Sequence, residues 1–188
     1  MEWLFTPWRM RYIQDPKRRR GEGCIFCEAL ARRDDRRTHV LHRGPRAFVI
    51  LNLFPYTTGH LLLAPNRHVA ALGDLDPAES GELMELLQRG ERVLDRAFGP
   101  QGFNVGANLG NVAGAGIPGH LHFHLVPRWK GDSNFMPVVG ETRIIPQSLD
   151  QTWRALRRGW EATPASGPAP RARRRARSSA AQRSRPRG

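Results

Sequence analysis

Apolar residues along this chain fall into short runs of strand length, and one longer segment carries them at helical spacing. The short runs predict strands. Gly44-Pro45 separates the first two runs and is a hairpin signal. The five predicted strands are residues 38–43, 47–51, 59–65, 103–108 and 120–127.

Residues 77–98 predict one long helix. Asp76 supplies an N-cap, a proline follows in the first turn, and Glu79 stands at the third helical position. Gly99-Pro100 ends the segment, and residues 152–160 predict a short terminal helix. The apolar residues expected on the buried side of the long helix are Leu83, Leu86, Leu87, Leu94 and Ala97. Clustered strands with hairpin connections favour an α+β fold, an antiparallel sheet with its helix on one face.

Length and composition set the limits of this fold. The chain has 188 residues and 39% hydrophobic residues, enough for one modest domain with extensions. Its longest apolar runs have strand length, and the N-terminus lacks the apolar core of a signal peptide. We therefore expect no membrane association and a cytoplasmic protein.

Positive charge is concentrated at the C-terminus. Eight arginines and no acids lie within residues 171–187, and removing them from the net charge of +13 leaves +5. This composition predicts disorder. The tail is either a solubilising extension or a tether that makes weak, non-specific contacts with nucleic acid. We predict three parts: an aromatic and basic N-terminal extension (1–23), a folded domain (24–162) and the Arg-rich tail (163–188).

Three histidines alternate with bulky apolar residues near the end of the predicted sheet. On a strand, His120, His122 and His124 leave one face while the intervening side chains leave the other. Buried imidazoles are costly unless each is bonded to a partner, a metal or a substrate. The pattern therefore predicts one packed face and one chemical face.

Cys24 and Cys27 form a C-x-x-C pair, and they are the only cysteines of the chain. This spacing lets two thiolates share a tetrahedral zinc ion that needs two further nitrogen or sulfur ligands. Unmetallated thiols and a redox pair are the alternatives. The redox alternative is weak, because no strand precedes the pair and no βαβ unit follows it.

The histidine segment resembles the signature of the histidine triad (HIT) family, in which apolar residues separate and follow three histidines. The resemblance covers roughly residues 24–149 and implies a HIT-like fold with an antiparallel sheet of about five strands. It implies that His122 is a nucleophile that attacks the α-phosphorus of a nucleotide and holds the nucleotidyl group covalently. His120 and His124 would orient that ring and supply donors to the phosphate oxygens.

The same resemblance implies a nucleotide site. Asn52 would hold the ribose hydroxyls; the alternative is a turn residue after a strand. His60, after Gly59, would lie beneath the sugar and phosphate. Asn108 and Gly116 would line the α-phosphate site, although the glycines around them are also typical of a tight loop.

Residues outside the triad complete the picture that the resemblance implies. Arg128 would grip a distal phosphate and Trp129 would stack on a base. His68 and His120 would join the two cysteines around a structural zinc, which would also fix the His120 ring beside the nucleophile. A homodimer is usual in the family.

The branch of the family rests on finer features. His124 stands where nucleotidyltransferase branches carry glutamine, which favours a hydrolase. Ile117 stands where the phosphoramidase branch has a serine. Residues 126–129 and 8–13 look most like bacterial HIT proteins associated with diadenosine tetraphosphate, some of which are phosphorylases. We therefore expect a dinucleoside polyphosphate hydrolase; the alternatives are a phosphorylase and a nucleotide-binding regulatory module with vestigial activity.

Overall fold

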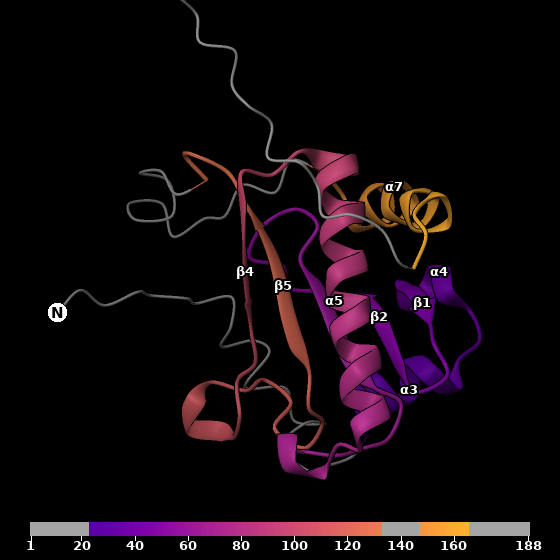
Figure 1. The fold of residues 1–188 in the computed structure, drawn as a ribbon, viewed down its shortest axis with the longest axis vertical. Coiled ribbons are helices and arrows are strands. Elements are labelled where there is room, and N and C mark those ends of the chain that lie inside the picture. The colour runs from indigo at the N-terminus through magenta and orange to yellow at the C-terminus, as the bar shows by residue number, and fades with distance from the viewer. Residues whose placement is uncertain (1–22, 133–146, 166–188) are drawn as a thin grey trace, which may run out of the picture.

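A five-stranded antiparallel sheet forms the centre of the molecule, in the order β1-β2-β3-β5-β4 (Figure 1). The computed structural model describes residues 23–132 and 147–165, so most of the predicted N-terminal extension and tail lies outside the described residues. The strands are β1 (Val40–Arg43), β2 (Ala47–Leu51), β3 (Leu61–Pro65), β4 (Gly102–Gly106) and β5 (Phe123–Arg128). The predicted α+β class and strand number are confirmed.

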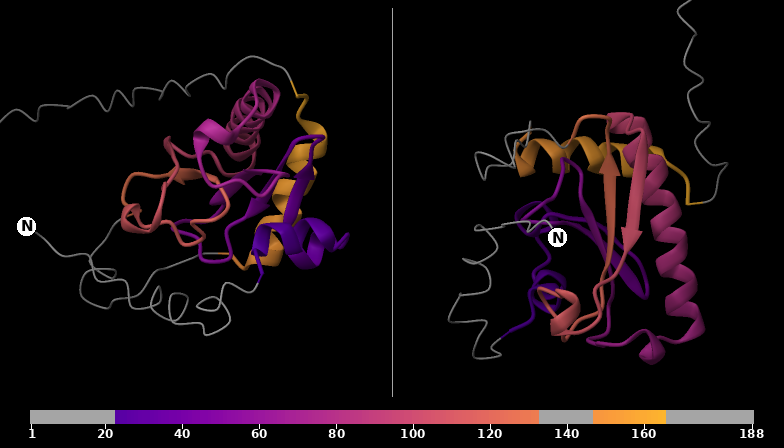
Figure 2. Two further views of the ribbon diagram at one scale, coloured as in Figure 1. Left: turned by 90° about the horizontal axis from the view of Figure 1, so that it is seen from below. Right: turned by 90° about the vertical axis from the view of Figure 1, so that its left-hand side faces the viewer.

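Helices cover both faces of the sheet (Figure 2). The long helix α5 (Pro77–Phe98) and α7 (Leu149–Ala162) pack on one face, over a core of leucines and valines that includes Val49, Leu63 and Leu125. The short helix α3 (Ile25–Ala31) covers the other face, where its Phe26 joins a second core. Among the described helices, none is long and apolar enough to cross a membrane.

Several element boundaries differ from the sequence prediction. Strand β5 begins at Phe123, so His120 and His122 precede the strand rather than lie on it. Helices α3 and α4 (Asp35–Thr38) were not predicted, nor were the 3-10 turns Leu72–Asp74 and Asn111–Ala113. Ala97 is exposed, because its neighbour Phe98 takes the position in the last turn of α5 that packs against the core.

Helix α7 is anchored at both ends. Its capping box begins at Ser148, and Trp153 donates from its indole to the carbonyl of Val40 on β1. Arg89 of α5 donates to the carbonyl of Thr163, a residue that is almost fully buried just after the helix ends. The first residues of the predicted tail therefore pack against α5.

The start of α5 is fixed by a buried carboxylate. Glu79 accepts two hydrogen bonds of 2.6 Å from Arg67 and a third, of 3.0 Å, from the backbone N–H of Asp76. The Asp76 side chain in turn accepts from the Glu79 N–H. The Arg67 guanidinium lowers the pKa of the Glu79 carboxyl from 4.5 to about 2. The chain after β3 is thereby tied to the helix that supports the sheet.

We predict that Glu79→Gln lowers the free energy of unfolding by about 1–3 kcal/mol at neutral pH, because charge-assisted bonds to a buried carboxylate are lost. Because the folded-state pKa is lowered, this contribution is complete above pH 4.5 and disappears as the pH falls towards about 2. Denaturant titrations of parent and variant across that range test this. The exposed Glu85 on the same helix supplies the control, Glu85→Gln. A parent–variant difference that persists undiminished at pH 2 would contradict the assignment.

Candidate active site and metal site

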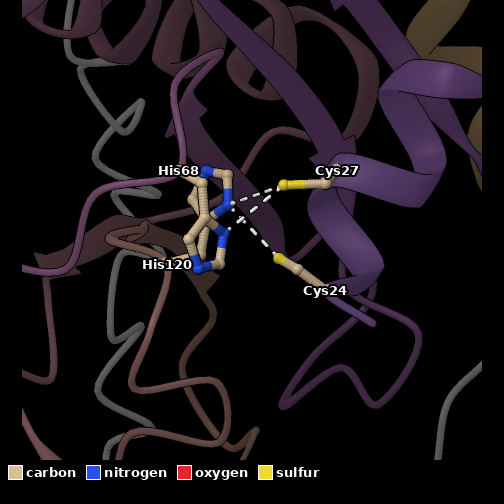
Figure 3. A group of neighbouring side chains, drawn as sticks. All are labelled: Cys24, Cys27, His68 and His120. Carbon is tan, nitrogen blue, oxygen red and sulfur yellow. Dashed lines mark hydrogen bonds between the residues drawn. The ribbon is translucent and has the colours of Figure 1, made fainter. Parts of the chain in front are cut away.

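The C-x-x-C pair and two histidines converge on one point between α3 and the sheet (Figure 3). Their four donor atoms, which are Sγ of Cys24 and Cys27 and Nδ1 of His68 and His120, lie within 4.8 Å of one another. Sulfur–nitrogen separations are 3.3 Å for Cys24–His120, 3.4 Å for Cys27–His68 and 3.7 Å for Cys27–His120. A tetrahedral zinc with ordinary bond lengths sets sulfur and nitrogen ligands about 3.5 Å apart. The donor set and its spacing both fit zinc.

Protonation states in this cluster also fit a metal. The Nε2–H of His120 donates to the carbonyl of Pro65 at 2.9 Å, which leaves the Nδ1 lone pair facing the cysteines. Burial lowers the pKa of His120, so its ring is neutral, as a metal ligand must be. Burial, reinforced by Cys24, raises the pKa of the Cys27 thiol. A divalent cation between the sulfurs would reverse that effect.

The middle histidine of the triad is oriented by the backbone of the first. His122 Nδ1 lies 2.8 Å from the carbonyl oxygen of His120. Because a carbonyl can only accept, Nδ1 carries the proton and Nε2 keeps its lone pair. Burial lowers the pKa of His122, which keeps the ring neutral. The centroid of the Phe26 ring lies 5.0 Å from the ring centroids of both His120 and His122, and this packing limits the movement of the two imidazoles.

The third histidine belongs to a separate chain of hydrogen bonds. The backbone N–H of Tyr56 donates to His60 Nδ1 at 3.1 Å, so His60 carries its proton on Nε2. That Nε2–H lies 2.9 Å from His124 Nδ1, which therefore accepts. A neutral His124 consequently has its proton on Nε2 and is a donor. The Tyr56 ring stacks on His124 at 6.0 Å and holds it in place.

A cavity of about 470 Å³ opens beside the triad. His122 and His124 form part of its wall, and most of the remainder comes from α3, α4, β2 and the loops that follow β2 and precede β5. His120 does not line it, since its ring is fully buried beside Cys24, Cys27 and His68. The alternation predicted from sequence is confirmed in effect, because Phe123 and Leu125 pack on the opposite face against the α5 core.

The structure brings three of the predicted nucleotide contacts to this cavity. Asn52, Asn108 and Gly116 all line it. The Asn52 side chain accepts from the N–H of Phe54 and approaches His60 Nδ1 at 3.3 Å, so it also performs the turn role weighed from sequence. His60 is fully buried behind His124 and does not line the cavity.

Arg128 and Trp129 lie away from the cavity, at and just beyond the far end of β5. The Arg128 guanidinium donates to both carboxylate oxygens of Asp132, at 2.6 and 2.9 Å, and to Asn104 at 2.7 Å. It thus has protein partners already. The contact of Arg128 with a distal phosphate and the contact of Trp129 with a base stay predictions.

Several cavity residues were missed by sequence reasoning. Phe26 lay unnoticed inside the C-x-x-C motif, and Tyr56 lay in a loop without a pattern. His39 also lines the cavity, in a left-handed conformation with φ 60°. The N-cap Asp34 before α4 was a local signal that could have placed this segment.

Comparisons with known proteins agree with this geometry. The HIT domain matches residues 33–131. A Mycobacterium tuberculosis protein named AP-4-A phosphorylase is 41% identical over 167 residues, which cover 86% of this chain and 85% of that protein. The asymmetrical bis(5'-nucleosyl)-tetraphosphatase of Schizosaccharomyces pombe is 34% identical, over 50% of this chain and 52% of that one.

A solved structure with the same fold is described as Zn-bound. The Zn-bound histidine triad family protein from Mycobacterium smegmatis superimposes with a TM-score of 0.60 at 26% identity, covering 74% of this chain and 94% of that one. The domain match spans more than half of the chain, and the Mycobacterium tuberculosis relative is similar over most of its length. This chain therefore belongs to the HIT-domain family.

Proposed function

We propose that this protein is an enzyme that cleaves dinucleoside polyphosphates through a covalent nucleotidyl intermediate on His122. The observation that carries the proposal is the bond from His122 Nδ1 to the His120 carbonyl. It leaves the opposite ring nitrogen, Nε2, with a lone pair on a residue that lines the cavity. The M. tuberculosis and S. pombe relatives are named for activity on such substrates.

The proposed reaction has two displacements. Nε2 of His122 forms a bond to the α-phosphorus, and the bond from that phosphorus to the bridging oxygen breaks, so diadenosine tetraphosphate would release ATP. The Nε2–H of His124 would donate to phosphate oxygens as charge develops. An acceptor oxygen then attacks the phosphorus, and the phosphorus–nitrogen bond breaks. Asn52, Asn108 and Gly116 would position the sugar and the α-phosphate.

The acceptor separates two candidate functions. Histidine at position 124, where the transferase branches carry glutamine, supports water as the acceptor and hence a hydrolase. The 41% identical relative named a phosphorylase supports inorganic phosphate. The cavity wall carries Ile117 where the phosphoramidase branch has a serine, so that activity has less support.

We also propose that Cys24, Cys27, His68 and His120 hold a structural zinc ion, which would stabilise the fold around His120. The M. smegmatis neighbour supports this, since it is described as Zn-bound. A homodimer is proposed as well. The edge strand β4 supports it, because Val105 is 57% exposed there.

The nucleophile is tested by His122→Asn. We expect turnover of diadenosine tetraphosphate to fall by about three orders of magnitude or more, because the covalent step is lost. Mass spectrometry of the quenched parent should show a nucleotidyl adduct that is missing from the variant. His42→Asn is the control, since His42 stacks on Trp160 on the opposite face. Turnover within about tenfold of the parent would contradict the mechanism.

The metal is tested by elemental analysis of protein purified without chelator. We expect about one zinc per chain, and Cys24→Ser should lower both the zinc content and the melting temperature, because a structural site contributes folding free energy. His42→Asn should retain the metal. Parent protein that contains no zinc would refute the site.

The acceptor is tested by product analysis with and without inorganic phosphate. Diadenosine tetraphosphate should give AMP and ATP if water is the acceptor, and ADP and ATP if phosphate is. Labelled phosphate that enters ADP would identify a phosphorylase. Tight nucleotide binding without products under either condition would instead indicate a regulatory module and overturn the proposed catalysis.

A further inference from the structure

The cavity extends across the sheet, well beyond the triad. His124 on β5 stands opposite Leu62 on β3, which stands opposite Ile50 on β2, which in turn stands opposite Val40 on β1. Three strand spacings separate the ends of this row, about 14 Å. His39, directly before β1, also lines the cavity. The cavity therefore runs from the triad to the segment around α4.

Its middle and its far end differ in chemistry. Apolar side chains form the middle, and they suit the flat faces of a base. These are Ile25, Phe26, Ala29, Ile50, Leu62 and Ile117. Arg32 lies six residues beyond Phe26, about 9 Å further along the α3 direction, and Arg37 lies on α4. Both arginines line the cavity. Helix α4 packs on β1, the edge strand three places from β5, so this is the end away from His122.

These two arginines are exposed, and they take part in no ion pair among the described residues. The neighbouring Thr38 hydroxyl donates to the carbonyl of Asp34, so its proton is already used. His39 is kept neutral, because burial lowers its pKa. The Glu28 carboxylate also lines the cavity, but it lies beside Gly23 at the start of α3. Guanidinium N–H groups therefore dominate the far end, and it is rich in hydrogen-bond donors.

We propose that Arg32 and Arg37 read the base of the nucleotide that His122 attacks, and that they favour a purine with an oxygen at C6. This inference rests on the proposed function. With its phosphorus at His122, a nucleotide must direct its base along the apolar middle, so that the edge of the base meets the two arginines. A 6-oxopurine offers two acceptors there, O6 and N7, which match a guanidinium. Adenine places an amino donor beside N7 instead.

Equilibrium binding of IMP and AMP tests this proposal, since the two nucleotides differ at C6 and in the adjoining N1 proton. The parent should bind IMP more tightly than AMP in calorimetric titrations. In Arg37→Met or Arg32→Met, the ratio of the two affinities should fall, by about tenfold where a bidentate contact is lost. The exposed Arg33 does not line the cavity, so Arg33→Met is the matched control and should keep the parent ratio.

Melting temperatures of all the variants establish that each is folded. An unchanged IMP-to-AMP ratio in both arginine variants, or a parent that prefers AMP, would overturn the assignment while leaving the cleavage chemistry intact. A parent that bound neither nucleotide and cleaved no dinucleotide would instead remove the proposed function itself. The two failures are therefore distinguishable.

Discussion

The hydrogen bond from His122 Nδ1 to the carbonyl of His120 is the interaction on which the site depends. It selects one of two tautomers and thereby leaves a lone pair on Nε2. The carbonyl is itself held in place, because the ring of the same residue is fixed between Pro65 and the two cysteines. A single residue thus links the cluster of two cysteines and two histidines to the proposed nucleophile. A change in the cluster would therefore shift the His120 carbonyl and misplace the His122 ring, although His122 itself is not part of the cluster.

A backbone group also fixes the tautomers of His60 and His124, the other two histidines of the site. The Tyr56 N–H sets the tautomer of His60, and His60 sets that of His124. The Nε2 atoms of the two rings therefore differ in protonation: His122 has a lone pair there, and His124 has a donor. Strand pairing keeps His60 and His124 close together, since β3, which begins after His60, and β5, which contains His124, are neighbours in the sheet. Contacts within the fold therefore determine which ring nitrogen of each of these histidines carries the proton.

Sequence patterns predicted the parts of this structure whose signals are local. The capping box at Asp76 and Glu79 placed the start of α5, and strand alternation separated the histidines from Phe123 and Leu125. Helix α3 escaped prediction because its N-cap, Cys24, makes no capping hydrogen bond through its side chain.

Other features depend on contacts between distant segments. The ring of His120 turns towards Cys24 and Cys27, which approach it from almost a hundred residues away in the chain. Arg32 and Arg37 lie across the cavity from strands of the sheet. No periodic pattern in the sequence connects these arginines with those strands. Arg128 looked like a phosphate ligand, but the nearby Asp132 already holds its guanidinium. Local patterns give the elements, whereas tertiary packing decides which polar groups face one another.

The central claim is that backbone groups fix the proton positions of the triad, and heteronuclear NMR of the histidine ring nitrogens tests it most directly. Near neutral pH, His122 should be neutral with its proton on Nδ1, and His124 should carry its proton on Nε2. A His122 ring that is protonated on Nε2, or that exchanges freely between the two tautomers, would contradict the account.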